Sequence, residues 1–341
     1  MKRLQQFLLV AFVLLMLAAC TTSPTPITGD TPAPGGTVSP TLPPVTPTAT
    51  STPLPGRLIL VTNTSPLEAE IHTVLETYTA DQGWQLVSQP GLAASDLGED
   101  VKIVLLLEPD SAQAALAESN PGIPFAAITS SNLPATANLS VLRLRPADEL
   151  FVAGFVTTII APDWRSGALL PADSPLGEGA GDAFVNGGRY FCGRCAPAFA
   201  PVVLFPVTAL LPSSSTVAEW QAAMDALQTN RLETLHLTPA AASPDLLSWL
   251  AGKDTILVGS QTPPADLSLR WAATVRADPA ALLPALLADL SAGSAGTEVA
   301  VPITLADVNP ELFSPGKQEW TQTVIQMLAD GEINPLSVPA Q

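Results

Sequence analysis

Short apolar runs recur along the chain from Leu58 onward, separated by segments with turn residues or helical periodicity. Runs of this length are typical of strands that are buried on both faces of a parallel sheet. In the first part of the chain the pattern predicts strands at Leu58–Val61, Trp84–Val87, Ile103–Leu107, Phe125–Ile128 and Leu139–Leu144. It predicts helices from Ser65 and over Ser111–Glu118.

The helix after the first strand has a defined beginning in the sequence. Ser65 is predicted to be its N-cap, with Pro66 at the first helical position and Glu68 closing a capping box. An apolar stripe then predicts the buried face of this helix, at Leu67, Ile71, Val74, Leu75 and Tyr78.

The segment from Pro146 to Cys195 predicts a helix, a short buried strand and a second helix. Leu150–Ile160 is apolar almost all round, so we expect this first helix to be covered on more than one side. Ala168–Leu170 is the strand. In the second helix, Gly187 and its small neighbours are expected to let the helix lie close against its sheet, because glycine has no side chain.

The remaining pattern continues the alternation of strand and helix, which predicts parallel sheets with covered faces. Further strands are predicted at Val202–Phe205, Thr234–Leu237, Thr255–Val258, Trp271–Val275 and Glu298–Ile303. Further helices are predicted after a capping box of Thr216 and Glu219, and over Ser243–Leu250, Pro279–Leu290 and Glu319–Ala329. The fold class is therefore α/β, with Rossmann-like lobes whose sheets are flanked by helices.

The first residues form a targeting pattern. Lys2 and Arg3 precede the apolar run Phe7–Leu17, and Leu-Ala-Ala-Cys ends at Cys20. This predicts a lipoprotein signal peptide over residues 1–20, with Cys20 acylated, for instance by palmitate. An ordinary signal peptide with a cysteine at its end is the alternative. Residues 21–56 are almost wholly Thr, Pro, Ser, Gly and Ala, which predicts a disordered linker.

Composition agrees with an exported protein anchored at the outer face of the cell membrane. The formal net charge is -17, and such a surface repels nucleic acid and anionic lipid headgroups, so no nucleic-acid partner is predicted. No second membrane-spanning segment is apparent, so any transport needs a separate membrane partner.

Cys192 and Cys195 form a CxxC pair that allows three interpretations. A disulfide in an oxidising compartment is favoured. A thioredoxin-type redox site lacks its sequence context, and a zinc site needs two further ligands, for which only His72 and His236 exist. No metal and no cofactor is therefore predicted.

No catalytic constellation is recognisable in the chain. His72 and His236 are each better explained by structural roles, and no nucleophile elbow, P-loop, dinucleotide fingerprint or zinc-protease motif occurs. We therefore expect a protein that is not an enzyme.

Four segments carry a resemblance to a known family. Ala153-Gly154-Phe155, the strand Gly167-Ala-Leu-Leu170 and the helix Ala183-Phe-Val-Asn-Gly187 occur in order, and Gly331-Glu-Ile333 follows near the end. Together they resemble the basic membrane protein family of bacterial lipoproteins. These are substrate-binding proteins of the type I periplasmic-binding fold, and some of them serve nucleoside ABC importers.

The resemblance implies two lobes. Lobe 1 is predicted at residues 57–145 plus about 264–296, and lobe 2 at 146–263 plus about 297–335, with crossings near Arg145, Pro263 and Gly296. It also implies closure of the two lobes on a small polar ligand, and an ABC permease as partner. The alternative is an envelope lipoprotein of the same fold that acts as a sensor or interaction module.

In an open parallel sheet a ligand lies beyond the carboxyl ends of the strands. This rule predicts the ligand-binding residues Asn63, Thr64, Ser65, Glu108, Ser130, Asp173, Phe205, Gly259, Ser260 and Gln261. Each of them also suits a turn or cap. Gly259-Ser260-Gln261 stands where nucleoside-binding members of the family carry an acidic residue, so the resemblance implies a small polar ligand, with nucleoside-like compounds among the candidates.

Overall fold

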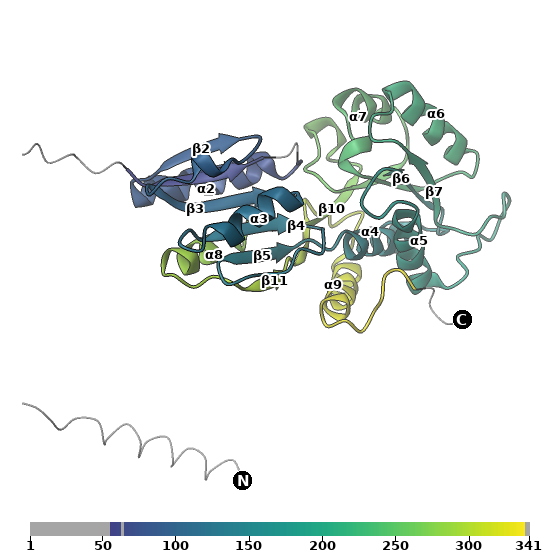
Figure 1. The fold of residues 1–341 in the computed structure, drawn as a ribbon. Coiled ribbons are helices and arrows are strands. Elements are labelled where there is room, and N and C mark those ends of the chain that lie inside the picture. The colour runs from purple at the N-terminus through teal and green to yellow at the C-terminus, as the bar shows by residue number, and fades with distance from the viewer. Residues whose placement is uncertain (1–54, 63–64, 338–341) are drawn as a thin grey trace, which may run out of the picture. The chain divides into compact units, whose positions relative to one another are not determined.

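The computed structural model describes residues 55–62 and 65–337, and its strands form two six-stranded sheets (Figure 1). The first sheet has the order β11-β5-β4-β3-β1-β2, and all its neighbouring strands run parallel. Its strands are β1 (Arg57–Val61), β2 (Gln85–Gln89), β3 (Val101–Leu107), β4 (Phe125–Thr129), β5 (Leu139–Arg143) and β11 (Glu298–Ala300).

The second sheet has the order β12-β10-β9-β8-β6-β7. Only β12 runs antiparallel to its neighbour, so the predicted α/β fold with two mainly parallel sheets is confirmed. Its strands are β6 (Ser166–Pro171), β7 (Val207–Leu211), β8 (Thr234–Leu237), β9 (Ile256–Gly259), β10 (Trp271–Ala277) and β12 (Ile303–Ala306).

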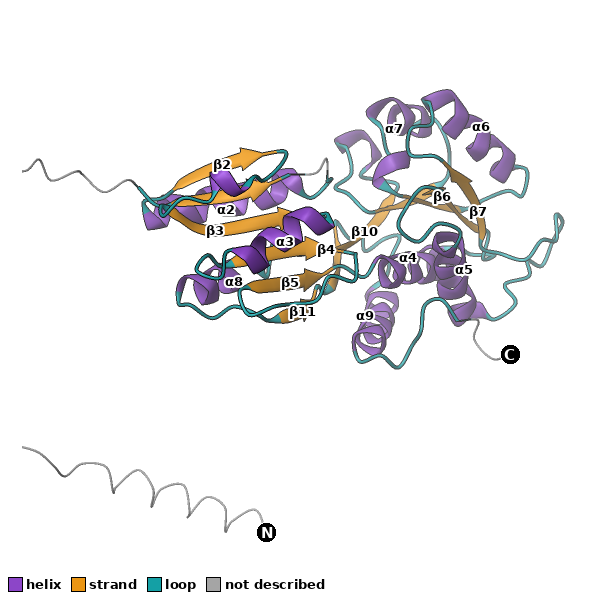
Figure 2. Cartoon of the chain, viewed as in Figure 1, coloured by secondary structure: helices purple, strands orange, loops and turns teal. Residues whose placement is uncertain are grey.

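Helices cover both faces of the first sheet (Figure 2). Alternate residues of β1 point to opposite faces, so Leu58 and Leu60 enter one core and Ile59 and Val61 the other. The first core is closed by α2 (Glu68–Gln82) and α8 (Leu283–Ser291), and the second by α3 (Ser111–Ser119).

The second sheet is covered in the same way. One core holds α4 (Pro146–Ile160), α5 (Gly179–Cys192) and α9 (Pro315–Ala329). The other holds α6 (Val217–Gln228) and α7 (Pro244–Leu250). No helix in the described part of the chain is long and apolar enough to cross a bilayer.

The α4 and α5 helices pack backbone against backbone. A Cβ atom built on Gly187 would lie 1.9 Å from the carbonyl oxygen of Phe151, and one built on Gly154 would lie 1.9 Å from that of Phe184. The sequence predicted that the small residues of α5 contact the sheet, but their closest contact is with the α4 helix. They allow α5 to approach α4, which explains why α4 is apolar all round.

Helix beginnings agree with the sequence at α6 and α7 but differ at α2, α8 and α9. The α8 helix begins at Leu283 and not at Pro279, and α9 begins at Pro315 and not at Glu319. Thr216 and Glu219 form the predicted capping box of α6, and the Ser243 hydroxyl caps α7. At α2 the helix begins later, with Leu67 at the N-cap position, and the Ser65 hydroxyl accepts only from the Leu67 N–H at 3.3 Å. The predicted capping box at Ser65 is therefore wrong.

Two predicted strands are also wrong. Val202–Phe205 is a loop, and the strand begins after Pro206, where β7 pairs with β6. Glu298–Ile303 is two strands, since β11 pairs with β5 of the first sheet and β12 with β10 of the second. Pro302 stands where the chain changes sheet, and proline has no N–H to continue a ladder.

The chain therefore crosses between the sheets three times, and two of these crossings lie at other places than predicted. The crossing between Arg143 and Pro146 agrees with the prediction near Arg145. The second crossing lies between Ala277 and Leu283, because β10 still pairs with β9, and the third lies between Ala300 and Ile303. The lobe boundaries near 264 and 297 are corrected accordingly.

Candidate functional site

At the carboxyl edge of the first sheet, one carboxylate connects the ends of two neighbouring strands. Glu108 follows β3, and its carboxylate accepts hydrogen bonds from the Thr129 hydroxyl at 2.9 Å and the Ser130 N–H at 3.0 Å. Its backbone has φ 43°, a left-handed conformation that non-glycine residues rarely adopt. The predicted residues Glu108 and Ser130 thus lie side by side at the carboxyl edge of this sheet.

The second sheet has a matching pair. Asp173 follows β6, and its carboxylate accepts from the Ser213 hydroxyl at 2.6 Å and the Ser213 N–H at 2.9 Å. These two hydrogen bonds lower the pKa of Asp173, the hydroxyl contributing most, so the group is a stable anion at neutral pH. Sequence reasoning missed Ser213 because it placed the strand β7 too early.

Phe205 is not part of this edge. It precedes β7, is 0% exposed, and packs in the core with Cys195, Trp220 and Trp271. The Arg165 guanidinium lies 5.8 Å from the centre of its ring. The prediction of Phe205 as a ligand-binding residue depended on the misplaced strand and is wrong.

Gly259 is the last residue of β9, and Ser260 and Gln261 follow it in the loop. A Cβ atom on Gly259 would lie 2.0 Å from the Trp271 ring, so the indole fills the space above this glycine. Trp271 Nε1–H donates to the Thr274 hydroxyl at 3.0 Å, which holds the ring in place.

Gln261 borders a pocket of about 510 Å³. Its amide Nε2 donates to the carbonyl of Ala242 at 3.3 Å, which joins the loops after β8 and β9. The other lining residues are mainly apolar, namely Ala242, Pro244, Leu247, Ser248, Thr262, Pro263, Pro264 and Asp266.

An ion pair connects the two lobes near the second crossing. The Arg276 guanidinium, near the end of β10, donates to both carboxylate oxygens of Glu70 on α2, at 2.7 and 3.0 Å. Both side chains are about one-third exposed. Sequence reasoning missed this pair because no spacing relates residues 206 positions apart.

Glu149, in the first turn of α4, lies beside this pair. Burial raises the pKa of Glu149, and the Ala277 N–H, the Ser260 hydroxyl and the Arg276 charge each oppose that rise. The Ala277 N–H donates to its carboxylate at 3.3 Å. Residues from α2, α4, β10 and the loop after β9 therefore gather where the chain crosses from one lobe to the other.

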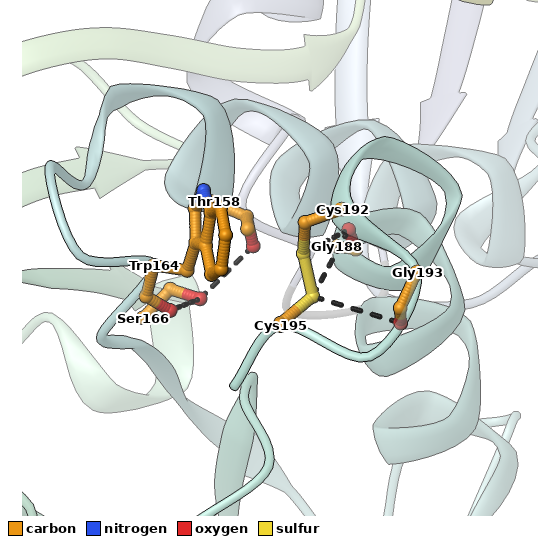
Figure 3. Close-up of a disulfide and its surroundings, with 7 residues drawn as sticks. All are labelled: Thr158, Trp164, Ser166, Gly188, Cys192, Gly193 and Cys195. Carbon is orange, nitrogen blue, oxygen red and sulfur yellow. Dashed lines mark hydrogen bonds between the residues drawn. A yellow bond between two sulfur atoms is a disulfide. The ribbon is translucent and has the colours of Figure 1, made fainter. Parts of the chain in front are cut away.

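The other predicted site residues are placed as follows. Ser65 lies before α2, while Asn63, Thr64 and the proposed lipidation site Cys20 are outside the described residues. Cys192 and Cys195 form a disulfide with their Cα atoms 5.1 Å apart, at the end of α5 (Figure 3). Its Cys192 sulfur lies 3.2 Å from the Gly188 carbonyl oxygen.

Both histidines have structural surroundings. His236 is fully buried in β8, stacked on Phe184 at 5.7 Å between ring centres, with Nδ1 3.1 Å from the Val258 carbonyl oxygen. Desolvation lowers its pKa to about 4, so the ring is neutral at physiological pH. His72 lies 3.5 Å from Glu76 on the outside of α2. Within residues 55–62 and 65–337, no group of three or more His, Cys, Asp or Glu side chains could hold a metal ion.

Solved structures share this arrangement. An ABC transporter solute-binding protein from Conexibacter woesei has a TM-score of 0.59 at 16% identity, over 82% of this chain and 98% of that one. One from Aeropyrum pernix has a TM-score of 0.61 at 12% identity, over 82% and 93%. A transcriptional activator of the comK gene from Bacillus halodurans has a TM-score of 0.59 at 12% identity, over 84% and 100%.

These likenesses define the fold as that of type I periplasmic-binding proteins. No family model matches the sequence, and no curated protein matches it either.

Proposed function

We propose that this chain is an extracytoplasmic solute-binding lipoprotein that binds a small polar ligand between its two lobes and presents it to an ABC permease. The observation that carries the proposal is the pair of polar loop clusters at the carboxyl edges of the two sheets. Glu108 with Ser130 forms one cluster and Asp173 with Ser213 the other, in a fold shared with solute-binding proteins. The proposal includes membership of the basic membrane protein family.

Charge favours one class of solute. The ionisable groups at these edges are the carboxyl groups of Glu108, Glu149 and Asp173 and the Arg276 guanidinium, and each of them is bound to a neighbouring group of the protein. Carboxylates accept hydrogen bonds from hydroxyl or amine groups. A polyhydroxylated or cationic solute therefore fits better than an anionic one, and a nucleoside-like compound remains within this class.

The proposed mechanism is hinge closure. The chain passes between the lobes at three crossings, which is the connectivity that allows one lobe to rotate against the other. The Glu70–Arg276 pair lies across these lobes and would restrain their rotation. A solute that contacts both edges would stabilise the closed form by its differential affinity.

Anchoring is a separate part of the proposal. Cys20 would carry the lipid and hold the domain at the outer face of the cell membrane. Labelled palmitate that enters the full chain but not the Cys20→Ala variant would support this placement. Equal labelling of both would contradict it.

A second function is favoured by the apolar pocket. Proline, alanine and leucine side chains dominate the lining of the pocket beside Gln261, and an exposed apolar surface of this kind also suits contact with a protein segment. An envelope sensor or interaction module of the same fold would use such a pocket.

A thermal-shift screen decides between these functions. The chain from Thr21 to Gln341, which keeps every described residue, is tested against nucleosides, bases, sugars and amino acids. A ligand at 100 times its Kd adds about 2.7 kcal/mol to the free energy of unfolding. We expect Asp173→Asn to abolish the shift and Asp289→Asn, an exposed substitution on α8, to preserve it. A screen without any shift contradicts solute binding, and equal loss in both variants contradicts the site.

A further inference from the structure

Half of the exposed large apolar side chains gather at one place. Among the described residues eight such side chains are exposed, and four of them lie in or next to the segment 193–206, which we call the stapled loop. Phe199 is 75% exposed, Val202 66% and Leu204 50%, and Trp164 beside the loop is 37% exposed. Surface apolar residues scattered singly need no explanation, but a cluster of this kind marks an interaction site.

The loop is held rigidly with these side chains outward. Arg165, itself only 5% exposed, donates to the carbonyl oxygens of Phe199 and Pro201. The Cys192–Cys195 disulfide fixes the beginning of the loop, and the Phe205 N–H closes its end on the Cys195 carbonyl at 3.2 Å. Exposure of the apolar groups is therefore a property of a fixed backbone and not of a disordered one.

The local charge is opposite to that of the whole chain. No acidic residue occurs between Asp182 and Glu219, although the chain has a net charge of -17. Three arginines border the loop, Arg189, Arg194 and Arg231, and none of them forms an ion pair within the described residues. The Asp163 carboxylate is engaged, because it accepts from the Ala198 N–H of the loop at 3.0 Å and pairs with Arg165 at 3.0 Å, and Glu233 accepts from the Asp163 N–H at 2.9 Å.

The shape of the loop favours a deformable partner. Figure 1 shows the segment between α5 and β7 standing out from the second sheet. A stable protein interface needs about 1,200–2,000 Å² of buried surface, far more than four side chains on a projecting loop present. Aromatic and aliphatic side chains flanked by arginine are instead typical of proteins that bind at the bilayer interface. There the apolar side chains enter the headgroup region and the guanidinium groups bind phosphates.

We propose that the stapled loop docks on a lipid bilayer that carries anionic headgroups. Phe199, Val202 and Leu204 enter the interface, and Arg194 and Arg231 contact its phosphates. The docking extends the proposed lipid anchoring, because about 35 residues between Cys20 and the first strand reach no further than roughly 120 Å. A lipid anchor therefore keeps the loop at a high effective concentration near the bilayer, where weak affinity suffices.

Vesicle sedimentation tests this docking without the anchor. The Thr21–Gln341 chain, which lacks Cys20, is mixed with vesicles of phosphatidylcholine plus phosphatidylglycerol or of phosphatidylcholine alone. We expect binding to the anionic vesicles that weakens with added salt. Phe199→Ser and Arg194→Glu should each reduce the partition coefficient about tenfold. The expected result does not depend on lipid anchoring, because the tested chain lacks Cys20.

Two matched variants control for general effects. Leu269→Ser removes the most exposed large apolar side chain of the described residues, 84% exposed and outside the loop. Lys317→Glu reverses a cation that forms no ion pair in the described part of the chain. Both should bind vesicles within about twofold of the unchanged chain, because neither side chain belongs to the loop. Absent vesicle binding overturns the proposal, as does equal loss in the controls. A change of oligomeric state in Phe199→Ser without vesicle binding overturns it in favour of a protein contact.

Discussion

The contact between α4 and α5 makes the sharpest prediction about stability. A methyl group at position 187 would lie 1.9 Å from the Phe151 carbonyl oxygen, against a normal carbon–oxygen approach of about 3.4 Å. Relief of that clash requires the two helix backbones to separate by about 1.5 Å. Because both helices pack on the second sheet in one core, such a separation disturbs the surrounding packing.

The magnitude follows from two opposing effects. Overpacking of a well-packed core costs about 1–3 kcal/mol or more, whereas alanine in place of glycine within a helix gains up to about 1 kcal/mol. We expect Gly187→Ala to lower the free energy of unfolding by about 2 kcal/mol, and Gly154→Ala to do the same from the other helix. Gly181→Ala is the control, since its Cβ would lie 3.4 Å from Thr208 Oγ1, an ordinary contact.

Urea unfolding followed by circular dichroism measures this difference. The Gly181→Ala variant should be as stable as the unchanged chain or up to about 1 kcal/mol more stable. If Gly187→Ala proves as stable as Gly181→Ala, the close approach of the two backbones is wrong.

Three further predictions concern charge and covalent links. Because the pKa of His236 is lowered to about 4 from 6.5, the unfolded chain takes up this proton first as the pH falls. The contribution of His236 to the free energy of unfolding should therefore fall by about 1.4 kcal/mol per pH unit between pH 6.5 and 4, so the stability of the unchanged chain relative to His236→Phe should fall with that slope. Burial raises the pKa of Asp148 to about 6, so Asp148 adds a pH dependence of opposite sign. That contribution is the same in the unchanged chain and in His236→Phe and cancels in their difference. If the stability of both proteins changed equally with pH, the burial of His236 would be refuted. The Cys192–Cys195 disulfide closes only a short loop, so its reduction should lower the free energy of unfolding by about 2 kcal/mol, as measured by thermal melting with and without reductant. Complete unfolding on reduction would contradict this expectation. Glu70→Gln should change stability by less than about 1 kcal/mol, because the pair is partly exposed, yet raise hydrogen exchange at residues 278–282, and unchanged exchange there would show that the pair does not restrain the crossing.

Hydrophobic periodicity was sufficient for most of the fold. Runs such as Ile103–Leu107 are buried on both faces and became central strands, and the caps at Thr216 and Ser243 locate two helix beginnings. Apolar runs interrupted by proline were harder, because Val202–Phe205 and Val207–Leu211 have similar composition and only pairing with β6 distinguishes them.

The candidate site was predictable only where it follows directly from a strand end. Glu108 and Asp173 were found by that rule, while Ser213 was lost with its strand. The Glu70–Arg276 pair forms because β10 belongs to the second sheet, and the sequence of β10 does not indicate to which sheet it belongs. Likewise, the apolar character of 193–206 is visible in the sequence, but its exposure depends on the carbonyl contacts of Arg165.

Hydrogen exchange with a solute identified by the thermal-shift screen tests the central claim most directly. The account predicts protection in both lobes at once, at the Glu108 and Ser130 loops of the first sheet and the Asp173 and Ser213 loops of the second. Protection in one lobe only, or confined to the apolar pocket beside Gln261, would contradict closure of two lobes on a shared ligand.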